Sequence, residues 1–393
     1  MRQAVIVSAA RTAVGRFQGS LSGFTAPQLG SIAVKEALAR ARVGSDRIDE
    51  VILGNVLQAG VGQNPARQAA LGAGFDPSIA AFTVNKVCGS GLKSVALAAQ
   101  AIRAGDGDIF VAGGMENMTL APYLIRNARN GIRLGHGEVT DSMVADGLWD
   151  VYEDYHMGNT AELVANELDV PRGMQDEFAA NSHNKAAAAA EAGKFDAEIV
   201  PIEIPQRKAD PITFKTDEGV RPGSSAEKLG KLRPAFQKEG SVTAGNASQI
   251  SDGGAAVVVM EEERAKALGL KPLARITGYA TGGVEPKWVM MAPVEAVKKL
   301  NAMRGTTVGD YDLVELNEAF SAQACAVTRK LDLDPARVNV HGGAVAIGHP
   351  IGASGCRILV TLLHAMADRG AATGLATLCL GGGNAVALSV ERI

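Results

Sequence analysis

A pattern in the first half of the chain recurs in the second half, and this internal repeat limits the possible folds more than any other feature. In the first half, Gly89-Ser90-Gly91 precedes a helical run and a strand that ends at Gly113-Gly114. In the second half, Ala353-Ser354-Gly355 precedes another helical run and the strand Leu375–Leu380, which three glycines follow. Predicted strands and helices alternate around both units. The sequence therefore predicts an α/β protein built from two similar halves.

The segment from about Thr119 to Ala247 interrupts this alternation and predicts an insertion in the first half. Between Arg207 and Lys238 it carries eight Lys/Arg against four Asp/Glu, in a chain whose net charge is −3. Such an excess is typical of a solvated, salt-bridged face. It also suits a site for a phosphate-bearing ligand. The charge pattern alone leaves both interpretations open.

The composition, with 47% hydrophobic and 21% charged residues, is that of a soluble globular protein of two or three domain-sized units. The slightly negative net charge argues against a nucleic-acid or membrane-surface binder. The four cysteines are widely spaced and form no C-x-x-C pattern, which favours a reducing, cytoplasmic location. The apolar run at Met1–Ser8 is too short for a signal peptide and is interpreted as a first strand.

The spacing of apolar residues places the remaining elements of the sheet layers. A polar loop at Arg11–Phe17 is expected at an active-site or interface edge. Strands are expected at 3–8, 51–57, 80–84, 108–114, 254–260 and 312–315, and helices at 29–42, 64–71 and 356–368.

Cys88 lies between the predicted buried strand Ala80–Val84 and a helical run that starts at Leu92. At a strand-to-helix turn the first helical N–H groups lack partners and the dipole is positive, so we expect a lowered thiol pKa. Gly89 and Gly91 would let a substrate approach the backbone closely. A free cysteine before a helix is also commonly a small buried hydrophobe. The motif alone does not decide between nucleophile and core residue.

Three motifs of the second half also place chemically useful side chains at predicted strand ends or turns, where α/β sheets bind ligands. Asn317 follows the strand 312–315, His349 lies in the repeat's counterpart of the Cys88 turn, and Cys379 ends the strand before Gly381–Gly383. Taken singly, Asn317 could be an ordinary turn residue, His349 a loop histidine and Cys379 a buried core residue. Their occurrence together at equivalent positions favours a functional site.

These motifs resemble those of the thiolase family, in the family's order and over essentially the whole chain. They comprise Asn85-x-x-Cys88-x-Ser90-Gly91, Gly113-Gly114-Met115-Glu116, Asn317-Glu318-Ala319-Phe320, Gly348-His349-Pro350-x-Gly352-x-Ser354-Gly355 and Cys379-x-Gly381-Gly382-Gly383. The resemblance implies the thiolase fold, with two duplicated βαβαβαββ halves in a layered αβαβα arrangement. It implies an N-terminal half over 1–118 plus 249–272, an inserted loop domain over 119–248 that binds CoA, and a C-terminal half over 273–393. The loop Thr119–Met143 resembles that of tetrameric thiolases and implies a homotetramer.

The resemblance implies reversible Claisen condensation of two acetyl-CoA to acetoacetyl-CoA and CoA. Cys88 would be the nucleophile that carries the acetyl group, and His349 would take the thiol proton. Cys379 would remove the α-proton of the second acetyl-CoA. One oxyanion site would consist of His349 and a water held by Asn317, and another of the backbone N–H groups of Cys88 and Gly381.

The resemblance also implies the residues that contact the substrate. Leu148, His156, Met157, Arg221, Phe236, Ala244 and Ser248 would contact CoA, and Met290, Ala319 and Phe320 would lie near the acyl group. Coenzyme A would be a substrate and product rather than a permanently bound cofactor. No metal, nucleic acid or membrane partner is expected. Cys325 and Cys356 are interpreted as structural.

Three stretches depart from the family pattern. Val289–Pro293 replaces Val-Met-Gly-x-Gly-Pro, Asn384-Ala385 replaces x-Gly, and Gln249 stands where glycine is common. The first change introduces larger residues beside the expected acyl pocket. His156-Met157 is similar to short-chain acetoacetyl-CoA thiolases, whereas the segment 247–252 is similar to degradative 3-ketoacyl-CoA thiolases. A short-chain enzyme is the leading prediction and a broad-range one the alternative.

Two other classes of protein are less consistent with these motifs. A decarboxylating ketoacyl synthase would place histidine or asparagine where Cys379 stands, so the second thiol argues against it. A non-catalytic acyl-CoA or lipid carrier would have no use for four reactive side chains, and replacing Cys88 would leave its function intact.

Overall fold

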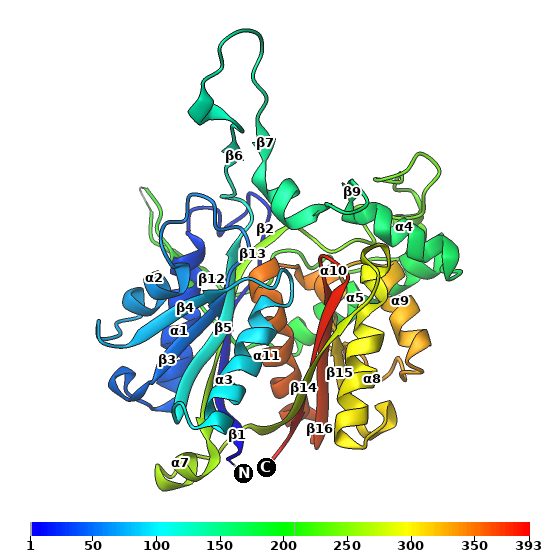
Figure 1. The fold of residues 1–393 in the computed structure, drawn as a ribbon. Coiled ribbons are helices and arrows are strands. Elements are labelled where there is room, and N and C mark those ends of the chain that lie inside the picture. Colours follow the sequence, from blue (N-terminus) through cyan, green and yellow to red (C-terminus); the bar gives the residue numbers. More distant parts are fainter. Residues whose placement is uncertain (1, 208) are drawn as a thin grey trace.

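The computed structural model describes residues 2–207 and 209–393 and has five layers of helices and strands (Figure 1). One core cluster lies between the N-terminal strands and the helices α1 (Ala26–Ala41) and α2 (Pro65–Gly72), and another between the C-terminal strands and the helices α8 (Ala292–Arg304) and α9 (Ser321–Lys330). The largest cluster fills the middle, around α3 (Ser90–Ala104) and α11 (Ile351–Arg369). The layer order is therefore helices, sheet, two central helices, sheet and helices, which is the αβαβα arrangement that the resemblance implied.

The N-terminal half supplies the strands in the order β4-β3-β5-β13-β1. β3 pairs in parallel with β4 and β5, whereas β13 pairs antiparallel with β5 and β1. The bounds are β1 Ala4–Thr12, β2 Gly15–Arg16, α1 Ala26–Ala41, β3 Glu50–Gly54, α2 Pro65–Gly72, β4 Ala80–Val84, α3 Ser90–Ala104, β5 Ile109–Asn117, β13 Ser251–Glu261 and α7 Glu262–Ala267.

The C-terminal half repeats this topology with the order β15-β16-β17-β14. β15 pairs in parallel with β16, and β17 pairs antiparallel with β16 and β14. The bounds are β14 Ala274–Gly283, η4 Pro286–Met291, α8 Ala292–Arg304, β15 Leu313–Leu316, α9 Ser321–Lys330, α10 Ala344–Ile347, α11 Ile351–Arg369, β16 Thr373–Leu380 and β17 Asn384–Glu391. A short antiparallel contact between β1 and β14 joins the two halves.

The two central helices touch at their N-terminal ends, where glycines allow close contact. A Cβ on Gly91 of α3 would lie 2.8 Å from the backbone nitrogen of Cys356, and one on Gly355 of α11 would lie 2.4 Å from that of Leu92. Such distances exclude any side chain at either position without movement of the backbone. The repeated glycines thus bring the turns that carry Cys88 and His349 to the same crossing.

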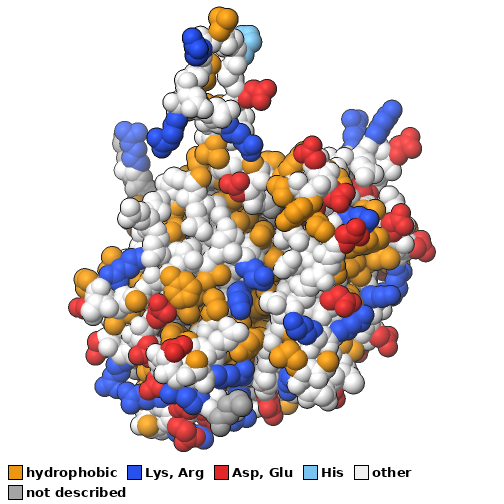
Figure 2. Space-filling view, in the orientation of Figure 1, with side chains coloured by type: hydrophobic (Ala, Val, Ile, Leu, Met, Phe, Trp, Pro, Cys, Tyr) orange, Lys and Arg blue, Asp and Glu red, His pale blue; other side chains and the backbone are white. Residues whose placement is uncertain are grey.

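The inserted segment contributes a hairpin, β6 Tyr123–Leu124 with β7 Thr140–Asp141, that projects from the body (Figure 1). Its other elements are η3 Val144–Leu148, β8 Trp149–Asp150, β9 Tyr155–His156, α4 Met157–Glu167, α5 Arg172–Glu191, β10 Ile199–Val200, β11 Ile202–Ile204, β12 Ile212–Phe214 and α6 Ala226–Gly230. Hydrophobic and basic side chains cover the hairpin (Figure 2). No helix in the described part of the chain is long and apolar enough to cross a membrane.

The structure corrects two expectations about local environment. Ala80–Val84 was predicted as a buried strand, but β4 lies at the edge of the sheet and Phe82 is partly exposed. Arg11 was predicted in an edge loop, but it lies in β1 and is fully buried. There its guanidinium bonds Glu198 at 2.6 Å and Asp217 at 2.7 and 2.9 Å. Both carboxylates come from the insertion, a pairing that local periodicity cannot indicate.

Candidate active site

Cys88 lies in a sharp turn between β4 and α3, and the backbone of this turn has an unusual conformation. Val87 has a φ of 46°, a conformation that is unusual for a β-branched residue. The Ser90 hydroxyl donates to the Val87 carbonyl at 2.6 Å and accepts from the Lys86 N–H at 2.8 Å, while the Asn85 side chain accepts from the Val87 N–H. Side chains on both sides of the turn therefore hold the strained peptide and fix the place of Cys88.

The pKa of the Cys88 thiol is raised, whereas the sequence predicted a lowered pKa. Burial raises the pKa of Cys88 to about 12, although the backbone N–H groups of Cys88 and Gly381 act in the opposite direction. Loss of hydration thus outweighs the helix terminus. A Cβ on Gly381 would lie 3.4 Å from the Val87 side chain, so the glycine turn after β16 packs against the Cys88 turn. This places the two predicted N–H donors on neighbouring turns.

His349 precedes α11 and is held in a defined tautomer. Its Nδ1 lies 2.6 Å from the Ser354 hydroxyl, and that hydroxyl lies 2.9 Å from the Pro350 carbonyl. Because the hydroxyl donates its single proton to the carbonyl, it must accept from Nδ1–H, which leaves Nε2 as a base. Burial and the Arg357 guanidinium lower the pKa of His349 to about 3. The imidazole is therefore neutral and able to accept a proton.

The raised pKa of the Cys88 thiol has a measurable consequence. Since the pKa of Cys88 is raised to about 12 by burial, its thiolate fraction should increase about tenfold per pH unit over the neutral range. We expect the rate of Cys88 alkylation by iodoacetamide, followed by peptide mapping, to rise steadily from pH 6 to pH 9. A pH-independent rate over that interval would instead indicate a preformed thiolate.

Cys379 lies in β16, and Asn317 directly follows the neighbouring strand β15. Burial and the neighbouring Cys88 charge raise the pKa of the Cys379 thiol. The Asn317 N–H donates to the carbonyl of Thr377, two residues before Cys379. Both polar atoms of the Asn317 amide are buried and have no partner in the described protein. Such an amide is suited to hold a water or a substrate oxygen.

A cavity of about 520 Å³ opens beside these groups. Cys379 and Gly381 line it, whereas Cys88, His349 and Asn317 lie outside its lining. All ten residues predicted to contact substrate line it: Leu148, His156, Met157, Arg221, Phe236, Ala244, Ser248, Met290, Ala319 and Phe320. Among the described basic residues of 207–238, Arg221 alone reaches the cavity, and Lys208 lies outside the described residues.

Aromatic rings form one wall of the cavity. The rings of His156 and Phe236 stack at 4.8 Å, and Phe236 meets Phe320 edge to face at 6.1 Å. The His156 Nδ1 accepts from the Gly158 N–H at 3.0 Å and so caps α4. Burial lowers the pKa of His156, which keeps this nitrogen unprotonated. The wall is apolar and positioned by the helix cap.

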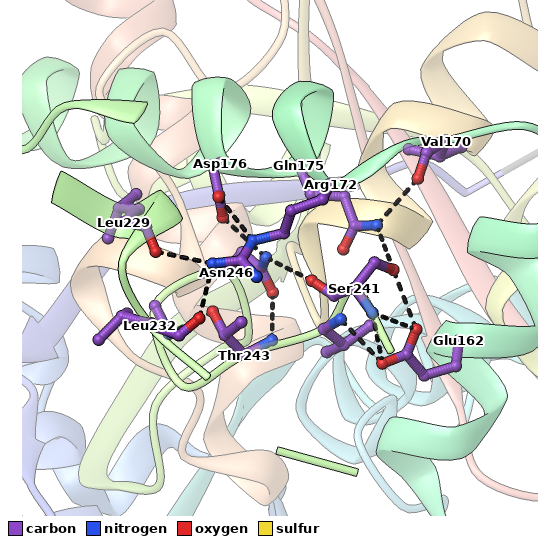
Figure 3. A network of polar contacts seen from close by, with 12 residues as sticks. Glu162, Val170, Arg172, Gln175, Asp176, Leu229, Leu232, Ser241, Thr243 and Asn246 are labelled. Atoms are coloured by element: carbon purple, nitrogen blue, oxygen red, sulfur yellow. Dashed lines mark hydrogen bonds and ion pairs between the residues drawn. The ribbon is translucent and has the colours of Figure 1, made fainter. Parts of the chain in front are cut away.

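A polar network holds the segment 241–246, which carries Ala244 to the cavity (Figure 3). The buried Glu162 carboxylate accepts from the N–H groups of Ser241 and Val242 at 2.8–2.9 Å. The Asn246 amide donates to Asp176 at 2.9 Å, and Asp176 also bonds Arg172. Helices α4 and α5 thus fix one end of this segment.

Nine other cavity-lining residues were not predicted as substrate contacts: Arg16, Phe17, Met118, Ala235, Ala247, Gln249, Ile250, Val289 and Leu380. Arg16 and Phe17 belong to the stretch expected at an active-site or interface edge, so the sequence carried a signal for them. Among the described residues no group of three His, Cys, Asp or Glu side chains is placed to hold a metal ion.

The duplicated α/β fold restricts the class of protein, and comparisons with known proteins identify the family. Residues 4–263 match the family model "Thiolase, N-terminal domain" and residues 270–392 match "Thiolase, C-terminal domain". The chain belongs to the thiolase family.

Relatives named acetyl-CoA acetyltransferase match over the full length. The chain is 59% identical to that of Cupriavidus necator over 392 residues and 58% identical to that of Escherichia coli over 394 residues, covering 100% of each chain. The crystal structure of the Bacillus anthracis acetyl-CoA acetyltransferase matches with a TM-score of 0.98 at 44% identity, covering 100% of this chain and 99% of that one.

Proposed function

We propose that this chain condenses two acetyl-CoA to acetoacetyl-CoA and CoA, and catalyses the reverse thiolysis, through an acetyl group on Cys88. The observation that carries the proposal is that Cys379, Gly381 and all ten predicted substrate contacts line one cavity, while Leu380 and Gly381 pack against the turn that holds Cys88. The full-length relatives with this activity in their names support the same substrates.

In the first half-reaction, His349 Nε2 accepts the Cys88 proton as the sulfur attacks the acetyl-CoA carbonyl. The departing CoA thiolate takes that proton back, and the acetyl group remains on Cys88 as a thioester. The N–H groups of Cys88 and Gly381 stabilise the oxyanion, and each donor contributes about 3–4 kcal/mol. A neutral His349 suits this role because it can accept the proton.

In the second half-reaction, the Cys379 thiol first loses its proton to solvent, and the resulting thiolate accepts the α-proton of another acetyl-CoA. His349 and a water held by the Asn317 amide stabilise the enolate oxygen. The enolate carbon attacks the acetyl-Cys88 carbonyl, the C–S bond breaks, and the Cys88 sulfur recovers a proton from Cys379 as acetoacetyl-CoA forms. The unpartnered polar atoms of Asn317 support this assignment.

The test of the proposed function is thiolysis by the purified protein, comparing acetoacetyl-CoA with a medium-chain 3-ketoacyl-CoA. We expect cleavage of acetoacetyl-CoA and a much slower reaction with the longer substrate. Comparable rates would assign the chain to the broad-range thiolases. Binding of acyl-CoA without any turnover would favour the carrier alternative.

Met290 provides a prediction about chain length. It is 2% exposed, lines the cavity beside Val289, and stands in the stretch that departs from the family pattern. Met290→Ala should enlarge the acyl side of the cavity and raise kcat/KM for a medium-chain 3-ketoacyl-CoA relative to acetoacetyl-CoA by about 10–100-fold. An unchanged ratio in a folded variant would place the limit on chain length elsewhere.

We propose that the protein is a cytosolic homotetramer, assembled as a dimer of dimers. We also propose that the chain is divided into two halves and an inserted domain over 119–248. Support for assembly comes from the projecting hairpin, whose apolar side chains have little to contact within one chain. Leu134 is 98% exposed, and Ile125, Ile132 and Val139 are each more than half exposed. Apolar surface of this kind marks association sites.

The hairpin yields a prediction about assembly. Leu134→Glu places a charge where the proposed contact excludes water, so sedimentation should show dimers instead of tetramers. The thermal unfolding midpoint of each dimer should change little. A tetramer that survives the substitution would move the contact away from the hairpin tip.

A further inference from the structure

Gln249 lies at the second end of the segment that Figure 3 shows anchored at 241–246. Its side-chain nitrogen donates to the carbonyls of Gly219 at 3.0 Å, Val345 at 3.0 Å and Ala346 at 3.1 Å. These acceptors belong to two different parts of the chain. Gly219 precedes the cavity residue Arg221 by two positions, whereas the other two acceptors are in α10, shortly before His349.

The Gln249 backbone reaches the catalytic histidine directly. Its carbonyl accepts from the His349 N–H at 3.1 Å and from the Ser251 hydroxyl at 2.8 Å. Gln249 therefore contacts the peptide of His349 through its main chain and the loop of Arg221 through its side chain. A Cβ on Gly219 would lie 2.6 Å from the Gln249 side-chain oxygen, so the loop packs closely against this amide.

The Arg221 loop has two further fixed points. The Asp217 carboxylate bonds the buried Arg11 and the Val14 N–H, and the His183 Nδ1 accepts from the Arg221 N–H at 3.1 Å. The second also leads toward His349 indirectly, because Ser182, the neighbour of His183 on α5, accepts from the Gly343 N–H at 3.0 Å. The Gln249 amide joins the loop to α10 directly, through a single side chain.

We propose that Gln249 is a positioning residue that couples the loop carrying Arg221 to the segment carrying His349. The inference rests on the proposed function and on the predicted contact of Arg221 with CoA, whose phosphates suit an arginine side chain. Replacing the side chain leaves the main-chain bond to His349 in place and releases the loop. The effect should therefore fall on recognition of the nucleotide part of CoA rather than on the chemistry at Cys88.

The test compares Gln249→Ala with wild type in thiolysis by two matched substrate pairs. One pair is acetoacetyl-CoA with CoA, and the other is acetoacetyl-pantetheine with pantetheine, which lacks the phosphates. We expect kcat/KM for the CoA pair to fall about tenfold, mainly through KM, with less than about twofold change for the pantetheine pair. Gln100→Ala, at an exposed glutamine of α3, is the matched control.

Two further measurements separate coupling from a general loss of structure. In an Arg221→Ala background the additional effect of Gln249→Ala on the CoA pair should disappear, because both changes act on one interaction. Amide hydrogen exchange of residues 217–222 should be faster in Gln249→Ala than in wild type. An equal loss with both substrate pairs, full additivity with Arg221→Ala, or unchanged exchange would each overturn the proposal. Failure of the proposed function would appear separately, as inactivity of the wild type, and the exchange result would still decide the coupling.

Discussion

Replacing Cys88 by alanine should abolish both acetoacetyl-CoA thiolysis and its formation, with a loss of at least about 10⁴-fold in kcat. The physical reason is that no other group in the turn can form the acyl-enzyme. Cys379 is buried at the end of β16, outside the turn between β4 and α3, and in the proposed mechanism it moves the α-proton rather than attacking the carbonyl, so it does not replace the missing nucleophile. Steady-state thiolysis measured at saturating CoA gives the comparison directly.

The matched control for this variant is Cys325→Ala, since Cys325 is a partly buried thiol on α9 that does not line the cavity. It should keep most of the wild-type rate. Thermal unfolding of Cys88→Ala should remain near the wild-type midpoint, because one partly exposed side chain is removed. Retention of activity in Cys88→Ala would leave the carrier interpretation as the better account of this residue.

Replacing Cys379 by alanine should separate the two half-reactions. Acetylation of Cys88 by acetyl-CoA needs only Cys88, His349 and the two N–H donors, whereas condensation also needs removal of an α-proton. Condensation and thiolysis should therefore fall by about 10²–10⁴-fold, while exchange of labelled CoA into acetyl-CoA continues. The measurement is the ratio of exchange to condensation in the same preparation.

Equal losses in exchange and condensation would contradict the division of labour between the thiols. Because Cys379 is buried, the substitution also leaves a small cavity, so the variant must first be shown to be folded. Cys379→Ser keeps the size and hydrogen-bonding capacity but is a far weaker acid. It should show the same separation, which a purely structural role for Cys379 would not produce.

Much of the fold follows from sequence because the two halves carry the same signals. The repeat around residues 89–91 and 353–355 predicted two similar halves, and the order β15-β16-β17-β14 repeats β3-β5-β13-β1, while β4 is an additional edge strand of the N-terminal half. Gly91 was predicted to let a substrate approach, but in the structure it allows close contact of the two central helices. What the sequence could not show depends on tertiary contacts. Arg11 can be fully buried because the carboxylates of Glu198 and Asp217, which lie far away in the sequence, pair with its guanidinium group.

In the candidate site, too, some features could be predicted from the sequence and others depend on tertiary contacts. The ten predicted substrate contacts line one cavity, since matching motifs specify them residue by residue. The predicted direction of the Cys88 pKa shift was wrong. The sequence indicates that Cys88 precedes a helix, which would lower the pKa, but it does not indicate the burial that raises it. Gln249 stood out only as a departure from the family pattern. Its hydrogen bonds to Gly219, Val345 and Ala346 require the folded arrangement of three segments.

The most direct test of the central claim is to identify the residue that carries the acetyl group. Wild-type protein is mixed with acetyl-CoA alone, quenched with acid, and digested for peptide mass spectrometry. The account predicts one acetyl group on the Cys88 peptide, removed when CoA is added before quenching. An active enzyme with unmodified Cys88, or with the acetyl group on Cys379, would contradict it.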